Sequence, residues 1–233
     1  MQLRAPWLAL ACFVSALPFA AAAPNTLTAE EKAAGWKLLF DGRSLDGWRG
    51  YKTEALGPGW KVVDGALTLT AGKTGDAITA AQYGDFELTF EWKISPGGNS
   101  GVIYRVGLGE AAVARTGPEY QILDNEKAKD SAIPNHLAGS LYDLGPATPR
   151  HLPKPVGEWN TGRIVVRGWK VEHWLNGTKV IAADLASPEG KALIAGSKFK
   201  TWTKFATFTR GHIALQDHGD VVAYRSLKLR ELK

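Results

Sequence analysis

The segment from Phe86 to Ile94 constrains the fold most strongly, because apolar and polar residues alternate along its whole length. Large apolar side chains occupy every second position, namely Phe86, Leu88, Phe90, Trp92 and Ile94. Side chains of a β-strand point alternately to opposite faces, whereas a helix would scatter these five around its circumference. The pattern therefore predicts a strand with one face buried in a hydrophobic core.

Turn signals divide much of the remaining chain into short segments. Asp64-Gly65 and Asn176-Gly177 are typical of tight β-hairpins. Further strands are expected over residues 163–171, 211–216 and 221–232. Many short strands separated by turns are typical of a sandwich or jelly roll.

Helix signals are few. Thr28 followed by Glu31 resembles a helix start. Ser187 before Pro188 predicts one short helix over residues 189–195. The sequence therefore predicts an all-β fold, a jelly-roll β-sandwich of two antiparallel sheets with a minor helix.

The first 22 residues have the layout of a secretory signal peptide. Arg4 precedes an apolar run from Pro6 to Ala21, and a cut after Ala22 satisfies the preference for small residues before the cleaved bond. The run is shorter than the ~20 apolar residues that a membrane span needs. A lipoprotein anchor on Cys12 is the competing interpretation, although Cys12 lies inside the apolar run. We expect a periplasmic or secreted protein without stable membrane insertion after signal removal.

This interpretation divides the chain into a signal peptide over residues 1–22, a lead-in over residues 23–35 and one jelly-roll domain over residues 36–233. Cys12 is the only cysteine, so its removal excludes a disulfide, a zinc–thiolate site and a cysteine nucleophile. Basic residues are scattered among acidic ones and the formal net charge is only +5, so we expect no nucleic-acid partner. The sequence does not indicate the oligomeric state.

The stretch from Gly117 to Asp124 reads as a strand with two different faces. Tyr120 and Ile122 would point to the core, while Glu119 and Gln121 would point away from it, roughly 7 Å apart. A carboxylate and an amide at this spacing suit a hydroxylated ligand. The stretch therefore predicts a polar sheet face that binds a sugar.

The stretch from Gly211 to Gly219 adds polar residues to the same prediction. If Ile213 and Leu215 face the core, then His212 and Gln216 face the opposite side. His218 would continue that side if the strand ran on. The side-chain direction of Arg105 stays open, because it shares its face with an apolar residue.

A metal site is only weakly indicated. Asp217, His218 and Asp220 lie close together in the sequence, but such turns are common without a metal and the zinc-binding spacings are absent. A divalent cation is the one cofactor left open.

Six motifs occur in the same order as in a known family, namely Leu39–Trp48, Asn99–Gly101, Gly117–Asp124, Gly157–Asn160, His173–Gly177 and Gly211–Gly219. Through them the chain resembles the 3-keto-disaccharide hydrolase family over about residues 36 to 232. The resemblance implies a concanavalin A-like lectin/glucanase jelly roll. It also implies cleavage of glycosides whose glucose ring has been oxidised at C3.

The implied chemistry differs from that of ordinary glycosidases. A ketone at C3 acidifies the hydrogen on C2, so a base can remove it and the enolate can expel the C1 oxygen. Addition of water would complete a net hydrolysis. Such a reaction needs a base, an acid for the departing oxygen and a group that stabilises the enolate oxygen.

The resemblance suggests residues for these roles. Glu119 or His218 would be the base, and Tyr142, or the other member of that pair, would be the acid. Arg105 or a bound cation would stabilise the enolate. The residues expected to bind the substrate are Asn99, Gln121, Asp124, Lys198, Gln216 and Asp217. The segment around His136 matches the family pattern less well, so His136 receives no role.

Two other functions fit the same residues. A carbohydrate-binding module without catalysis would use the same sheet face and stack sugars on tryptophans. An ordinary glycoside hydrolase would use Glu91 or Glu119 with a second carboxylate. Turnover of an oxidised sugar and of its unoxidised parent separates these alternatives.

Overall fold

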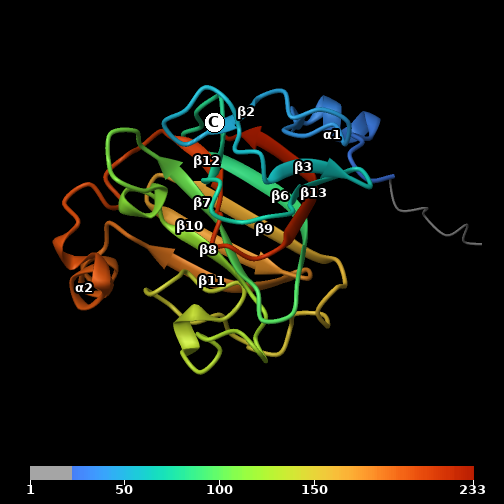
Figure 1. Cartoon of the computed structure of the whole chain (residues 1–233). Helices are drawn as coiled ribbons and strands as arrows, with labels where there is room; N and C mark the ends of the chain where they lie inside the picture. The colour runs from blue at the N-terminus through green and yellow to red at the C-terminus, as the bar shows by residue number, and fades with distance from the viewer. Residues whose placement is uncertain (1–22) are drawn as a thin grey trace, which may run out of the picture.

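The computed structural model describes residues 23–233, which form a two-sheet antiparallel β-sandwich of jelly-roll type (Figure 1). The predicted signal peptide, residues 1–22, lies outside the described residues. The architecture confirms the predicted all-β fold of two antiparallel sheets.

The larger sheet has eight strands within the described residues. Their order is β11 (Thr178–Asp184), β10 (Lys170–Leu175), β9 (Asn160–Arg167), β6 (Phe86–Ile94), β13 (Val222–Glu231), β4 (Ala66–Leu69) and β3 (Trp60–Val63), with β1 (Lys37–Leu38) also paired to β13. The smaller sheet has the order β2 (Trp48–Gly50), β5 (Ala77–Thr79), β12 (His212–Leu215), β7 (Asn99–Val106) and β8 (Glu119–Leu123).

The hydrophobic core fills the space between the two sheets. The alternating apolar residues of β6 are all buried there, as their period of two predicts. Tyr120 and Ile122 of β8 are fully buried from the other side, and the ring of Tyr120 packs edge-on against Phe90 at 5.3 Å between centroids. Consequently Glu119 and Gln121 belong to the outer face of the smaller sheet, as predicted.

Two α-helices occur among residues 23–233, α1 (Ala29–Ala33) and α2 (Pro188–Gly196). The Thr28 hydroxyl accepts the N–H of Glu31 and the Glu31 carboxylate accepts the N–H of Thr28, which is a complete capping box. Short 3-10 turns are η1 (Val113–Arg115), η2 (Pro134–His136) and η3 (Lys198–Thr201). No helix of the described chain is both long and apolar enough for a membrane crossing.

One predicted strand is wrong in its extent. The segment over residues 163–171 is interrupted, because β9 ends at Arg167 and β10 begins at Lys170, which pair with each other across a tight turn. Gly168 has a φ of +56° within this turn, a conformation that favours glycine. The segment is therefore the corner of a hairpin between β9 and β10.

Candidate active site

Polar positions form a continuous row across the outer face of the smaller sheet. Gly101 of β7 pairs with Gln121 of β8, and Gln216, just after β12, donates its N–H to the Gly101 carbonyl over 2.9 Å. Asp76, just before β5, accepts the N–H of Asp217 at Oδ1 over 2.8 Å, and the register of β5 and β12 continues to Asp76 beside Gln216. Paired residues point to the same face of a sheet. The row therefore runs Asp76, Gln216, Gly101, Gln121.

An apolar row lies directly beside the polar one. Ile78, Ala214 and Ile103 are paired neighbours and belong to a buried cluster separate from the main core. Glu119 pairs with Ile103 at the end of this row, and the Tyr142 N–H donates to the Glu119 carbonyl over 3.1 Å. Glu119 therefore lies where the apolar and polar parts of the outer face meet.

The carboxylate of Glu119 is unusual in its surroundings. The residue is 5% exposed, and within the described chain its carboxylate oxygens form neither a hydrogen bond nor an ion pair. Burial raises the pKa of Glu119 to about 8, with a further increase from the negative charge of Asp76 and a partial decrease from the positive charge of Lys198. Such a carboxyl can donate or accept a proton near neutral pH.

Lys198 and Tyr142 form a hydrogen-bonded pair next to Glu119. The Lys198 Nζ donates to the Tyr142 hydroxyl over 3.0 Å and also lies 4.1 Å from the centre of its ring. Partial burial lowers the pKa of Lys198, while Glu119 opposes that decrease. Burial, with the Glu119 charge as a further cause, raises the pKa of the Tyr142 phenol. The pair therefore presents a cation and a protonated hydroxyl beside the carboxyl group.

His136 contacts Tyr142 directly and is linked to Lys198 through Asp143. Its Nδ1 lies 3.2 Å from Asp130 Oδ2 and its Nε2 lies 3.1 Å from Asp143 Oδ1, so the ring is held between two carboxylates. The ring packs on Tyr142 at 4.4 Å between centroids. The other oxygen of Asp143 accepts the backbone N–H of Lys198 over 2.9 Å. One network therefore fixes both members of the Lys198–Tyr142 pair.

Side-chain amides occupy the outer face between Glu119 and Asp76. Among residues 23–233, the Oε1 atoms of Gln121 and Gln216 are buried without a hydrogen-bond partner. The other side-chain end of Gln121 donates to Asn99 Oδ1 over 3.2 Å. An unpaired buried acceptor costs about 1–3 kcal/mol, which a ligand hydroxyl would recover. The structure thus brings Asn99, Gln121 and Gln216 into one hydrogen-bonding surface.

Asp217 and His218 lie at the border of this surface in different roles. The Asp217 carboxylate accepts the backbone N–H groups of Lys73, Thr74 and Gly75 over 3.0, 2.6 and 3.0 Å. Asp217 therefore holds the loop before β5, which positions Asp76, and its oxygens are occupied. His218 is exposed, and its charge opposes the burial that raises the pKa of Asp76 to about 6.

The side chain of Arg105 does not lie beside Glu119, although it was expected to stabilise the enolate. It has a φ of +54° at an irregularity in the pairing of β7 with β12, and such bulges re-aim side chains. Its guanidinium donates to Asp85 over 2.8 Å and to the carbonyl oxygens of Gly84 and Gly168 over 3.2 and 2.6 Å. Arg105 therefore joins the two sheets at an edge of the sandwich.

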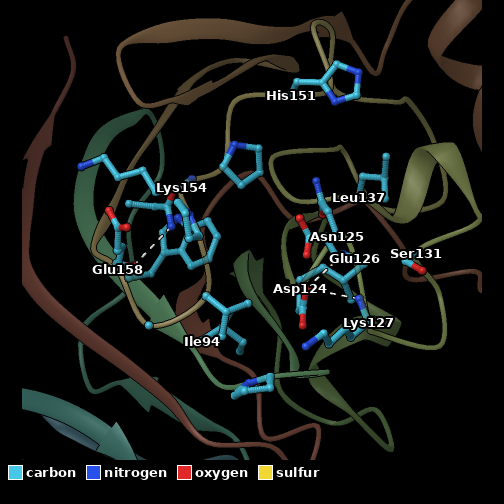
Figure 2. Close-up of a pocket in the computed structure, with 18 of the residues that line it drawn as sticks. Ile94, Asp124, Asn125, Glu126, Lys127, Ser131, Leu137, His151, Lys154 and Glu158 are labelled. Carbon is cyan, nitrogen blue, oxygen red and sulfur yellow. Dashed lines mark hydrogen bonds between the residues drawn. The ribbon is translucent and has the colours of Figure 1, made fainter.

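Asp124 also lies apart from Glu119. Its carboxylate accepts backbone N–H groups from Gly97, Glu126 and Lys127 over 2.7, 3.0 and 3.2 Å. It lines a separate pocket of about 620 Å³ between the loops at residues 124–131 and 150–158, where Figure 2 shows it beside Glu126 and Lys127. The structure thus places Asp124 as a loop-holding residue, not as a neighbour of Glu119.

Glu91 lies on the outer face of the larger sheet and is ion-paired with Arg225, so it is not a partner of Glu119.

Among residues 23–233, no group of three or more His, Cys, Asp or Glu side chains is arranged to hold a metal ion. The side chains Asp217, His218 and Asp220 therefore do not form the weakly indicated metal site by themselves.

The comparisons with known proteins agree on one family. Residues 35–230 match the model of the 3-keto-alpha-glucoside-1,2-lyase-like domain. The chain belongs to this family. A protein named 3-keto-disaccharide hydrolase from Bacteroides thetaiotaomicron is 32% identical to it, over 91% of this chain and 83% of the relative. The resemblance predicted from the six motifs is confirmed, and the chain is a carbohydrate-active enzyme with a sugar substrate.

Solved structures show the same architecture. A crystal structure from Parabacteroides distasonis, described as a candidate glycosyl hydrolase, superposes with a TM-score of 0.85 at 31% identity and covers 91% of this chain and all of that one. A carbohydrate-binding module from Bacillus subtilis gives a TM-score of 0.51 at 13% identity, over 79% of this chain and 96% of that one. The second likeness concerns the fold alone.

Sequence reasoning missed two residues of the site. Asp76 could have been found by counting back from Ile78, because both occupy the outer face of the strand region. His136 lies in a 3-10 turn within a long loop, where no periodicity reports side-chain direction. Only the folded loop shows that it stands between Asp130 and Asp143.

Proposed function

We propose that the protein is a periplasmic or secreted enzyme that cleaves 3-keto-glycosides, including 3-keto-disaccharides. The reaction removes the proton from C2, expels the C1 oxygen and then adds water to the resulting enone. The family match and the curated relative support this substrate class, and the outer face of the smaller sheet supplies groups suited to each step.

The observation that carries the proposal is the buried Glu119 carboxyl beside the Lys198–Tyr142 pair. A pKa raised to about 8 by burial lets Glu119 transfer protons near neutral pH. Lys198 and Tyr142 would stabilise the negative oxygen of the enolate, the role first expected of Arg105. The amides of Asn99, Gln121 and Gln216 would hold sugar hydroxyls.

His218 remains the second candidate for proton transfer, because it is exposed at the border of the same surface next to Asp76. A divalent cation is a further candidate for stabilising the enolate. The four described residues Glu119, Lys198, Tyr142 and His218 thus carry the proposed chemistry.

The test is incubation of purified protein with a 3-keto-disaccharide beside its unoxidised parent. We expect enone absorbance and free sugar from the oxidised compound only. Glu119→Gln should lower the rate by about 100-fold or more, in the range of a lost acid–base group. Release of sugar from the parent at a similar rate would instead support an ordinary glycoside hydrolase. Parental rates in both Glu119→Gln and His218→Ala would remove the assignment of these residues.

A further inference from the structure

Asp76 is a second carboxylate on the outer face that no motif pointed to. Its backbone carbonyl accepts the N–H of Tyr51 over 2.9 Å, and its Oδ1 accepts the N–H of Asp217 over 2.8 Å. Asp217 in turn holds the preceding loop by three backbone N–H groups. The side chain of Asp76 is therefore fixed through one oxygen, while Oδ2 accepts no hydrogen bond within the described chain.

Asp76 and the Glu119 carboxylate lie on either side of Gln216 on the outer face. Gln216 stands between Asp76 and Gly101, so the backbones of Asp76 and Gly101 are about two strand spacings, roughly 10 Å, apart. The Glu119 carboxylate reaches over Gly101 from the neighbouring strand and narrows this distance. Gln216 lies between Asp76 and the Glu119 carboxylate, and its buried Oε1 has no hydrogen-bond partner within the described chain, so it is free to accept a ring hydroxyl.

We propose that Asp76 is the base that removes the C2 proton and that Glu119 is the acid that protonates the departing C1 oxygen. This inference rests on the proposed function and assigns its two proton-transfer roles. It replaces the choice between Glu119 and His218 as base, because the Asp217 N–H fixes the Asp76 carboxylate and Asp76 lies across Gln216 from the Glu119 carboxylate.

The reaction consumes one water molecule and no other co-reactant. Asp76 takes the proton of C2, and the electron pair of the C2–H bond forms the enolate. The enolate expels the C1 oxygen, which takes the proton of Glu119 as the C1–O bond breaks. Water then adds to C1 and gives a proton to Glu119, while Asp76 returns its proton to C2. Both carboxyl groups end in their starting states.

The pKa values of the two carboxyl groups support Asp76 as the base and Glu119 as the acid. Burial raises the pKa of Asp76 to about 6 and that of Glu119 to about 8. Between these values Asp76 is ionised and Glu119 is protonated, as a base and an acid must be. The other titratable groups that interact electrostatically with the two carboxylates are Tyr51, Tyr142, Lys198, Asp217, His218 and, from the core, Tyr224.

The first test isolates proton removal in the unmodified protein. The compound is 3-keto-1,5-anhydroglucitol, which has no exocyclic oxygen at C1 and can exchange its C2 hydrogen but not be cleaved. NMR measures the rate of C2 hydrogen exchange in deuterated water, from which the rate without protein is subtracted. We expect this rate to rise through pH about 6 and then stay level to pH 8. A rate that rises only through pH about 8 would make Glu119 the base and overturn the inference.

The second test separates the two roles by substitution. Asp76→Asn keeps an oxygen that can accept the Asp217 N–H, and we expect it to lose both exchange and cleavage by about 100-fold or more. Glu119→Gln should lose cleavage to that extent while exchange stays within about tenfold. Glu126→Gln, an exposed carboxylate in the separate pocket that Asp124 lines, serves as the matched control at parental rates.

The outcomes distinguish this inference from the proposed function. If the parent protein does not cleave the 3-keto-disaccharide at all, the proposed function fails. If it does, but Asp76→Asn exchanges C2 hydrogen at the parental rate, only the assignment of Asp76 fails. If Asp76→Asn does not fold, the exchange profile of the unmodified protein still separates Asp76 from Glu119, and loss of exchange in His218→Ala would make His218 the base and overturn the inference.

Discussion

The carboxylate of Glu119 occupies the space in which a side chain on Gly101 would stand. Gly101 of β7 pairs with Gln121 of β8, and Glu119 lies two residues before Gln121 on the same outer face. A methyl group on Gly101 would overlap Oε1 of Glu119 and approach its Cδ and Cγ as well. The glycine thus permits the carboxyl group to lie flat across β7, toward Gln216 and Asp76.

Replacement of Gly101 by alanine should therefore displace the carboxylate. We expect Gly101→Ala to lower kcat/KM by about 100-fold, since small misplacements of a reacting group cost that much. The added volume should also lower the free energy of unfolding by about 1–3 kcal/mol. Steady-state kinetics and urea unfolding measure the two effects.

Gly196→Ala is the matched control for this substitution. Gly196 ends α2 and has no atom near the position of an added methyl group. Alanine is the better helix former, so activity should be unchanged and stability equal or higher. A parental kcat/KM in Gly101→Ala would show that the position of Glu119 over β7 is not needed.

Lys198 should set the alkaline limb of the activity profile. Its positive charge lowers the pKa of Glu119 against the larger effect of burial. In Lys198→Met the pKa of Glu119 should rise above about 8, so the alkaline limb should move to higher pH while kcat falls. Lys198→Arg keeps the charge and should keep the position of the limb. An unmoved limb in Lys198→Met would contradict this electrostatic coupling.

His136 should act as a positioning residue for Tyr142 and Lys198. In His136→Phe the ring contact with Tyr142 is kept and both bonds to carboxylates are lost. We expect kcat to fall by about tenfold with little change in KM, measured at a temperature where the variant is fully folded. His136→Gln keeps one bond and should recover part of the rate. His151→Phe, at an exposed position, is the control.

The sheet pattern could be predicted because burial imposes a period of two. The alternation along β6 and the faces of Glu119 and Gln121 follow directly from it. The corner at Gly168 was missed because Gly168-Trp169 is not one of the Asn-Gly or Asp-Gly pairs that mark other hairpins of this chain. The alternation of residues in the sequence thus predicts which sheet face a side chain occupies, but it does not predict where a strand ends.

The site was less predictable where the backbone departs from regular geometry. The bulge at Arg105 turns its side chain toward Asp85, which no alternation in the sequence reveals. The carboxylates of Asp124 and Asp217 are occupied by backbone N–H groups of distant or following loops. Sequence motifs identify such residues as important but do not separate a ligand contact from a loop anchor.

The stability of the protein should depend on pH through Glu119. The folded-state pKa of about 8 lies above the ordinary value of 4.5, so the folded state retains a proton that the unfolded chain has lost. This stabilising contribution is full below pH 4.5 and disappears as the pH rises through 8. Its size is at most roughly 5 kcal/mol, from 1.36 kcal/mol per pKa unit.

Glu119→Gln isolates this contribution. The variant has no ionisable group at this position, so its free energy of unfolding should fall less between pH 5 and pH 9 than that of the parent. Asp76 titrates in both proteins, and its effect largely cancels in the comparison. Parallel curves for parent and variant across this range would show that Glu119 is ionised in the folded protein at neutral pH.

Arg105 should contribute to stability and not to the reaction. Its side chain is 4% exposed and holds the carbonyl oxygens of Gly84 and Gly168, whereas its partner Asp85 is 42% exposed and can be solvated. Arg105→Met therefore removes the three hydrogen bonds of a buried guanidinium and should lower the free energy of unfolding by about 2–4 kcal/mol. Because these contacts belong to the sandwich edge, kcat/KM of the folded variant should stay within about twofold of the parent. A large loss of kcat with an unchanged melting temperature would return Arg105 to the enolate-stabilising role that the family resemblance first suggested.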